Sequence, residues 1–164
     1  MYQSSDENMA AVSLGSNLGD SLAIVEGAIA TIQERLKPAY IKKSSWYRTK
    51  PIGPPQPDYV NGCIAFPYEK EPEALMQHLL DIEQQFGRER SVRWGARTLD
   101  LDLLLLGQQI NDTEFLRLPH PRIGERAFVL VPLSEIYSTW MHPLNGLSVA
   151  DMLKDLPIDD IEKI

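Results

Sequence analysis

The sequence predicts an α+β fold, because strand-like and helix-like segments follow one another along the chain in the order β-α-β-β-α-β. Two segments carry apolar residues at helical spacing, and four other segments have compositions typical of strands. This order resembles a ferredoxin-like plan, with helices packed on a sheet and additions at the C-terminal end. The 164 residues are 43% apolar, which suits one compact domain. We expect a single domain over residues 1–164, with residues 1–8 as a poorly ordered extension.

The first three elements are a strand, a helix and a second strand. Residues 10–14 (AAVSL) form a short apolar segment that ends at a glycine-containing turn. Asp20 can cap a helix over residues 20–36, in which apolar residues recur at spacings of three and four. Pro38 ends this helix. Residues 39–48 carry aromatic and hydroxyl side chains and predict the second strand.

A proline-rich loop, another strand and a second helix come next along the chain. Four of the seven residues from 51 to 57 are proline, which indicates a semi-rigid loop without regular structure. Residues 58–68 predict a strand. An apolar stripe over residues 72–86, with Pro72 in the first turn, predicts a helix. Residues 87–98 are polar and without a period, so they predict a loop.

The C-terminal part contains one clear strand and several short elements. Residues 99–107 (LDLDLLLLG) predict a strand, and a turn begins within residues 108–112. Residues 119–126 are irregular. The apolar segment 128–136 fits either a strand or a helix, because periodicity does not separate the two. Residues 148–156 predict a last short helix.

The composition argues against two classes of partner. A formal net charge of −7 disfavours non-specific binding to nucleic acid, which depends on clustered positive charge. The N-terminal residues lack the basic start and apolar stretch of a signal peptide, and the longest purely apolar run is far too short to cross a bilayer. A single cysteine, Cys63, suits a reducing compartment. We therefore expect a cytoplasmic protein without a nucleic-acid or membrane partner.

Two acidic side chains lie two residues apart on the strand at 99–107. Because alternate residues of a strand share a face, Asp100 and Asp102 project side by side. Leu99, Leu101 and Leu103 then point the other way, and the aspartate face continues with Leu104 and Leu106. With apolar residues on both faces, this strand is expected to lie in the centre of the sheet.

Adjacent carboxylates repel each other and are costly to bury unpaired, so a cation should offset their charge. Magnesium fits, because it takes oxygen ligands and is often held by one or two carboxylates together with substrate phosphates. Two metal ions about 4 Å apart can clamp a phosphoryl group from both sides. Alternatively, the two aspartates lie at a strand end, solvated or paired with arginine.

Four arginines lie within ten residues just before this acidic pair: Arg88, Arg90, Arg93 and Arg97. Arginine presents a planar fork that matches phosphate oxygens, and phosphoryl transfer relies on positioning and charge stabilisation. The alternative is a solvated basic loop neutralised by neighbouring acids. Together, the arginines and the aspartates indicate nucleotide chemistry, although they do not specify the acceptor.

The sequence resembles the 6-hydroxymethyl-7,8-dihydropterin pyrophosphokinases of folate biosynthesis. The main matching segment is RWGARTLDLDLLLLG, at residues 93–107. Four further segments match in the family's order: LGSNLGD (14–20), YRTKPIGPPQPDYVN (47–61), IEQQFGRER (82–90) and PHPRIGERAFVLVPL (119–133). The resemblance implies a ferredoxin-like α+β fold, ATP as co-substrate and two bound Mg²⁺ ions.

The resemblance also implies roles at the nucleotide. Asp100 and Asp102 would be the metal ligands, and Arg88 and Arg97 would act on the phosphates in catalysis. Arg90 and Trp94 would lie on a loop that closes over ATP. The remaining nucleotide contacts would come from Glu83, Leu103, His120 and Arg126.

The pterin site implied by the resemblance lies elsewhere in the chain. A flat bicyclic ring needs aromatic faces and a few polar groups at its edge. Tyr59 and Phe128 would sandwich the ring, with Trp94 also contributing. Its edge would be bonded by Asn61 and by the backbone of Thr49 and Ile52. From composition alone, core packing is the favoured explanation of Tyr59 and Phe128. For Asn61 the alternative is a turn or a surface strand position.

The implied reaction is attack by the pterin hydroxymethyl oxygen on the β-phosphorus of ATP, with release of AMP. The matched segments contain no obvious general base, so positioning and metal activation would supply most of the catalysis. We expect the small molecules ATP and hydroxymethyldihydropterin as partners, and a monomer. Two alternatives remain: a non-catalytic ferredoxin-like nucleotide- or RNA-binding module, and another Mg²⁺-dependent phosphoryl transferase on the same scaffold.

Overall fold

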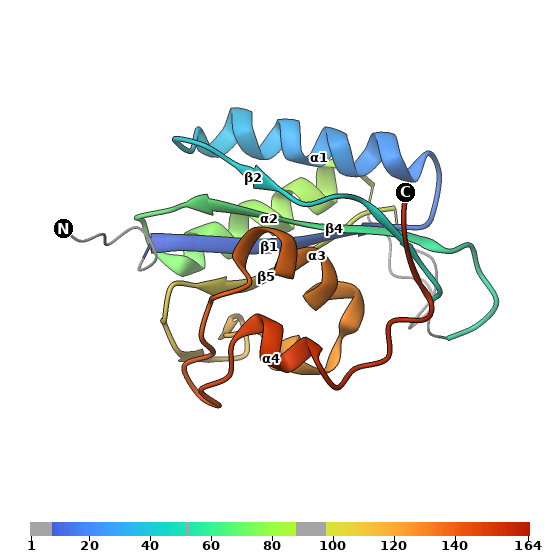
Figure 1. Ribbon diagram of the computed structural model, residues 1–164. Helices are drawn as coiled ribbons and strands as arrows, with labels where there is room; N and C mark the ends of the chain where they lie inside the picture. Colours follow the sequence, from blue (N-terminus) through green and yellow to red (C-terminus); the bar gives the residue numbers. More distant parts are fainter. Residues whose placement is uncertain (1–7, 52, 88–97) are drawn as a thin grey trace.

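The computed structural model describes residues 8–51, 53–87 and 98–164 and shows the expected α+β architecture (Figure 1). Its main sheet has the strand order β5-β1-β4-β3-β8, and the short strand β2 also pairs with β4. Neighbouring strands of this sheet run antiparallel. The strands are β1 (Met9–Ser16), β2 (Lys42–Lys43), β3 (Tyr47–Thr49), β4 (Tyr59–Pro67), β5 (Asp100–Leu106) and β8 (Ile161–Lys163). The order β5-β1-β4-β3 is that of a ferredoxin-like sheet, so the predicted plan is confirmed.

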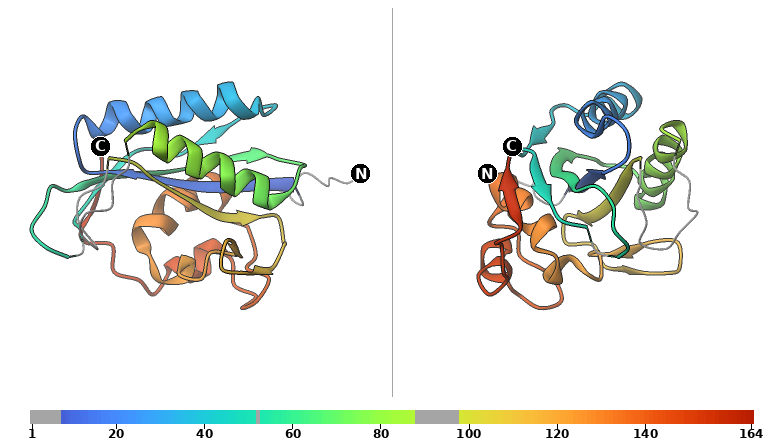
Figure 2. Two further views of the ribbon diagram at one scale, coloured as in Figure 1. Left: turned by 180° about the vertical axis from the view of Figure 1, so that it is seen from behind. Right: turned by 90° about the vertical axis from the view of Figure 1, so that its right-hand side faces the viewer.

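Helices cover both faces of this sheet (Figures 1 and 2). The predicted helices, α1 (Ser21–Leu36) and α2 (Pro72–Gln85), lie together on one face. As predicted, the Asp20 side chain caps α1 by accepting from the Ala23 amide at 3.3 Å. On the opposite face lie α3 (Ala127–Tyr137) and α4 (Val149–Leu153). The apolar segment at 128–136 is therefore a helix, and α4 is shorter than the predicted 148–156.

The sheet separates two apolar clusters. One cluster fills the space beneath α1 and α2, and includes Val12, Ile32, Phe66 and Leu79. The other lies beneath α3 and α4, and includes Ala11, Leu105, Leu130 and Trp140. Because both faces are buried, the strands are apolar on both sides. Across residues 8–51, 53–87 and 98–164, no helix combines the length and the apolar character needed to cross a bilayer.

The acidic strand β5 lies at the edge of the sheet, so the prediction of a central strand is wrong. It is apolar on both sides because helices cover both faces, not because strands flank it on both sides. Its register with β1 also shifts, since Ala11 pairs with Leu105 and Val12 with Leu103. Leu104 is the extra residue of this bulge, and the predicted alternation ends there. Leu106 consequently packs with Leu101 and Leu103 rather than on the aspartate face.

The predicted strand 39–48 is divided into β2 and β3. Lys43 pairs with Ile64 and Tyr47 with Asn61, so this segment advances four residues while β4 advances three. The extra residue turns the segment, and the Trp46 indole donates a 2.9 Å hydrogen bond to Glu26 on α1. In the same stretch, the Ser44 hydroxyl accepts from the Cys63 amide at 2.9 Å. The Ser44 amide also donates to the Cys63 carbonyl at 3.0 Å, so side-chain bonds supplement the backbone pairing here.

Three short strands were not predicted from the sequence patterns. Beginning in the segment predicted as a turn, β6 (Asn111–Asp112) and β7 (Arg117–Leu118) form a small hairpin. Near the C-terminus, β8 pairs with β3 and places Ile161 opposite Thr49. The expected N-terminal extension lies outside the described residues, apart from Asn8, whose carbonyl accepts from the Tyr68 amide at 2.7 Å.

The glycine at position 62 allows β4 to pass close to an aromatic ring. A Cβ atom placed on Gly62 would lie 2.5 Å from ring carbons of Trp46. We expect Gly62→Ala to lower the free energy of unfolding by about 1–3 kcal/mol, because overpacking forces the ring or the strand to move. Urea denaturation measures this change. Gly124→Ala is the matched control, since its Cβ would meet only Met152 Sδ at 3.5 Å, and its stability should stay close to wild type.

Candidate functional site

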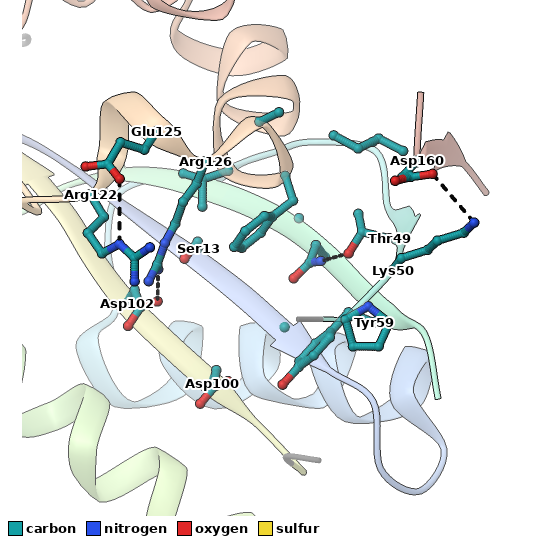
Figure 3. A pocket seen from close by; sticks show the side chains of 18 of the residues that line it. Ser13, Thr49, Lys50, Tyr59, Asp100, Asp102, Arg122, Glu125, Arg126 and Asp160 are labelled. Carbon is teal, nitrogen blue, oxygen red and sulfur yellow. Dashed lines mark hydrogen bonds and ion pairs between the residues drawn. The ribbon is translucent and has the colours of Figure 1, made fainter. Parts of the chain in front are cut away.

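A cavity of about 540 Å³ opens between one end of the sheet and the start of α3 (Figure 3). β1 contributes Ser13 and Gly15 to its wall, and β5 contributes the two aspartates. The rest of the wall comes from the ends of β3 and β4, the loop before α3 and the C-terminal segment. The residues that these segments contribute to the cavity include Thr49, Tyr59, Asn61, His120, Arg126, Phe128, Asp160 and Ile161. Residues far apart in the sequence therefore meet in one place.

Asp100 and Asp102 face this cavity from the same side of β5, as the strand period predicts. Arg126, just before α3, extends toward Asp102, and its Nη1 lies 3.8 Å from Asp102 Oδ2 (Figure 3). This separation is longer than a charge-assisted hydrogen bond of about 2.7–2.9 Å. The Asp102 side chain is 42% exposed, so its oxygens are accessible to a further cation.

His120 lines the same cavity beside Asp102. Burial lowers the pKa of His120; the neighbouring Asp102 opposes this shift, while Arg126 and Arg122 add to it. The Arg122 backbone amide donates to His120 Nδ1 at 3.2 Å. Because Nδ1 accepts, the neutral ring carries its proton on Nε2. The lowered pKa favours the uncharged ring at neutral pH, with a hydrogen-bond donor at Nε2.

Polar and aromatic side chains gather at the other end of the cavity. Asn61 is buried, being 7% exposed, and its amide donates to the Thr49 hydroxyl. Gly15 makes room for it, because a Cβ atom at Gly15 would lie 2.6 Å from Asn61 Oδ1. Tyr59 and Phe128 line the same space. Arg126 also stacks over the Phe128 ring, with the guanidinium carbon 5.7 Å from the ring centroid.

The turn after β1 is fastened to the proline-rich loop before β4. Asn17 is 2% exposed, and its amide nitrogen donates to Gln56 Oε1 and to the Pro57 carbonyl, both at 2.8 Å. These bonds join segments 39 and 40 residues apart in the chain. They fix the loop beside Tyr59, and no sequence period or propensity signalled them.

A second cavity, of about 300 Å³, shares Asp102 and His120 with the first. Its apolar wall comes from α2, β5 and the β6–β7 hairpin, and its other lining residues are Met76, Leu103, Glu114, Phe115, Leu116, Arg117 and Pro121. Leu103 thus lines the second cavity, whereas Tyr59 and Phe128 line the first. The hairpin residues were not predicted as site residues, because the sequence pattern there indicates only the beginning of a turn.

The two aspartates fit a hard divalent cation. Among the described residues, no group of three or more His, Cys, Asp or Glu side chains is arranged to hold a metal ion. The described part of the protein therefore offers two carboxylates, while other oxygen ligands must come from elsewhere. That is the usual situation for Mg²⁺, which retains water and binds substrate phosphates. Transition metals that prefer nitrogen or sulfur ligands fit this site less well.

Five site residues of the sequence analysis lie outside the described residues: Ile52, Arg88, Arg90, Trp94 and Arg97. Glu83 is described, and it is placed differently from the other assigned residues. It is 5% exposed on α2, and its Oε2 accepts from the Leu101 backbone amide at 2.7 Å. It is not among the described residues lining either cavity.

Residues 11–138 match the family model described as 7,8-dihydro-6-hydroxymethylpterin-pyrophosphokinase. A relative from Synechocystis sp., named 2-amino-4-hydroxy-6-hydroxymethyldihydropteridine pyrophosphokinase, is 44% identical over 147 residues, which are 90% of this chain and 75% of the relative. A relative of the same name from Haemophilus influenzae is 40% identical over 144 residues, covering 87% of this chain and 89% of the relative.

Solved structures show the same fold. The crystal structure of Plasmodium falciparum HPPK-DHPS with pteroate superposes with a TM-score of 0.61 at 12% sequence identity. The match covers 89% of this chain but 42% of that longer chain, so this chain spans less than half of it. At this identity the likeness supports the fold alone.

Proposed function

We infer the reaction from one premise: the chain belongs to the 7,8-dihydro-6-hydroxymethylpterin-pyrophosphokinase family. It is an ATP-dependent enzyme of folate biosynthesis that transfers pyrophosphate to hydroxymethyldihydropterin. In this transfer the hydroxymethyl oxygen forms a bond to the β-phosphorus of ATP, and the bond from that phosphorus to the oxygen bridging the α- and β-phosphates breaks. AMP leaves with the bridging oxygen, and the hydroxyl proton is released.

One observation carries the placement of the substrates: two adjacent cavities share Asp102 and His120. A transferase must hold a donor and an acceptor on either side of the reacting phosphorus. We propose that the nucleoside of ATP occupies the cavity lined by Met76, Leu103 and Phe115. The triphosphate then passes Asp102 and His120 toward the larger cavity, where the acceptor lies.

The larger cavity suits the pterin. Tyr59 and Phe128 supply aromatic surface, and Asn61 supplies an amide that can exchange hydrogen bonds with the polar edge of the ring. The Thr49 backbone belongs to the same wall, and we propose that it bonds the ring edge as well. Ile52 and Trp94 remain assigned to this site by the family resemblance.

At the phosphates, His120 would donate from Nε2, and Arg126 would turn from Asp102 to a phosphate oxygen. Asp100 and Asp102 would hold two Mg²⁺ ions, which supply charge neutralisation of the phosphates and in-line orientation when bound. Arg88, Arg90, Trp94 and Arg97 complete the proposed nucleotide site, with Arg88 and Arg97 in the catalytic role. Glu83, assigned to this site by the family resemblance, is instead buried against the β5 backbone at Leu101.

We further propose that residues 1–164 form one domain that works as a monomer in the cytoplasm. The single domain is supported by the main sheet, because both apolar clusters pack against it. The single cysteine, Cys63, is buried and its thiol donates to the Val129 carbonyl, which agrees with a reducing compartment.

The activity is tested by incubating the protein with ATP, Mg²⁺ and hydroxymethyldihydropterin and separating the products by chromatography. We expect AMP and the pterin diphosphate in equal amounts, with no AMP when the pterin is omitted. Release of ADP would instead favour single phosphoryl transfer, and tight RNA binding without turnover would favour a binding module. Either result would overturn the proposed function.

The Asn17 contacts give a prediction about the acceptor. Asn17→Ala removes both 2.8 Å hydrogen bonds to the loop at Gln56 and Pro57, so the loop beside Tyr59 loses its fixed position. We expect the KM for the pterin to rise about 30-fold, since two partly buried bonds each contribute roughly 1 kcal/mol. The KM for ATP should change little.

Steady-state kinetics with each substrate varied in turn check this prediction. Gln56→Ala removes one of the two bonds and should give a smaller rise in the pterin KM. If Asn17→Ala raised both KM values equally, the contact would stabilise the whole protein rather than position the loop.

A further inference from the structure

Glu83 is a buried acid on α2 that bonds the backbone of β5. Burying a carboxylate is costly unless strong hydrogen bonds compensate it. Glu83 is 5% exposed, and its Oε2 accepts from the Leu101 amide at 2.7 Å, a length typical of a charge-assisted bond. The acid comes from α2, so this bond ties a helix to the sheet. It is made to the backbone of the strand that carries both proposed metal ligands.

The position of Leu101 gives this bond its significance. In the described part of the sheet, β5 pairs with β1 on one side and is the edge strand. Every outward amide of an edge strand needs another partner or water. Leu101 lies between Asp100 and Asp102, which pair with Gly15 and Ser13 of β1. The outward amide that Glu83 holds is therefore the one between the two aspartates.

We propose that Glu83 is a positioning residue, which fixes the pleat of β5 at Leu101 and thereby sets how Asp100 and Asp102 are presented to the metal-bound nucleotide. The two aspartates project to the α3 face, where the large cavity opens, whereas Leu101 packs with the cluster beneath α1 and α2. Glu83 acts on them through the backbone and not by contact with substrate. This inference rests on the proposed function.

Two substitutions separate positioning from direct contact. Glu83→Gln keeps an oxygen acceptor at the same place but removes the charge, whereas Glu83→Leu removes both with little change of volume. The first readout needs no ligand: the hydrogen-exchange rate of the Leu101 amide in the uniformly ¹⁵N-labelled protein. We expect slow exchange in wild type and Glu83→Gln, and exchange about 10-fold faster or more in Glu83→Leu.

The second readout is the Mg²⁺ concentration that gives half of the maximal rate. Glu83→Leu should raise it about 10-fold and lower kcat, because the aspartates lose their fixed separation. Glu83→Gln should stay within about threefold of wild type, and neither variant should change the pterin KM by more than that. A residue that only stabilised the fold would lower the melting temperature without moving the Mg²⁺ dependence.

Glu73→Gln and Glu73→Leu are the controls, since Glu73 lies exposed on the same helix and carries the same charge. Both should match wild type in both readouts. If Glu83→Leu does not fold, Glu83→Ala takes its place, because the smaller alanine side chain leaves space that water can enter.

Three outcomes would overturn the proposal. They are protected Leu101 exchange in Glu83→Leu, unchanged Mg²⁺ dependence in that variant, or Glu83→Gln as impaired as Glu83→Leu. The last would show that the charge itself contacts a substrate or metal. Failure of the proposed function is distinguishable, because wild-type protein would then release no pterin-dependent AMP. The exchange rates measured without ligand would still test the hydrogen bond from the Leu101 amide to Glu83.

Discussion

Asp102→Asn should lower kcat by about 1,000-fold or more, because the change removes the charge that we propose holds a metal ion at the point where the two cavities meet. The amide has nearly the shape of the carboxylate, so packing is preserved. Stability should change by less than about 1 kcal/mol, since the Arg126 contact of Asp102 is 3.8 Å long and partly exposed.

Turnover is measured as AMP release at saturating substrates, and folding by urea denaturation. Asp155→Asn is the matched control, because Asp155 is an exposed acid remote in sequence from β5, and it should retain full activity. A folded Asp102→Asn protein with near-normal Mg²⁺-dependent turnover would remove Asp102 from the metal site.

Asn61→Ala should raise the KM for the pterin about 10- to 100-fold, with a smaller effect on the KM for ATP. The amide is buried at the aromatic end of the large cavity, between Gly15 and Thr49. Its removal would take a hydrogen-bond partner from the polar edge of the pterin in the binding mode that we propose. That lost partner accounts for the expected loss of affinity.

Thr49→Val refines this experiment. This variant keeps Asn61 but removes the Thr49 hydroxyl. The Asn61 amide nitrogen then loses the hydrogen-bond acceptor that fixes its side chain. An intermediate rise in the pterin KM is expected. Asn111→Ala, in the β6–β7 hairpin, should leave the pterin KM unchanged. An Asn61→Ala enzyme with unaltered pterin KM would place the acceptor elsewhere.

Local sequence signals predicted much of this fold. The helical period predicted both α1 and α2, Asp20 identified the start of α1, and the strand period placed Asp100 and Asp102 on one face. These features depend on residues close together in the chain. The family resemblance added the aromatic and amide residues, which the fold brings into one cavity.

The errors arose where contacts distant in sequence decide the structure. Both faces of β5 are covered by helices, so its apolar composition resembled that of a central strand. The bulge at Leu104 and the extra residue between β2 and β3 depend on the partner strands. The roles of Asn17 and Glu83 depend on hydrogen bonds to segments that sequence patterns do not connect.

A crystal structure with Mn²⁺ and a non-hydrolysable ATP analogue tests the central claim most directly, because Mn²⁺ prefers the same oxygen ligands as Mg²⁺ and is located by anomalous scattering. We predict metal peaks within about 2.3 Å of carboxylate oxygens of Asp100 and Asp102. The phosphates should cross from the cavity at Leu103 toward that at Asn61. Metal ions and phosphates bound elsewhere, with both carboxylates unligated, would contradict this account of the site.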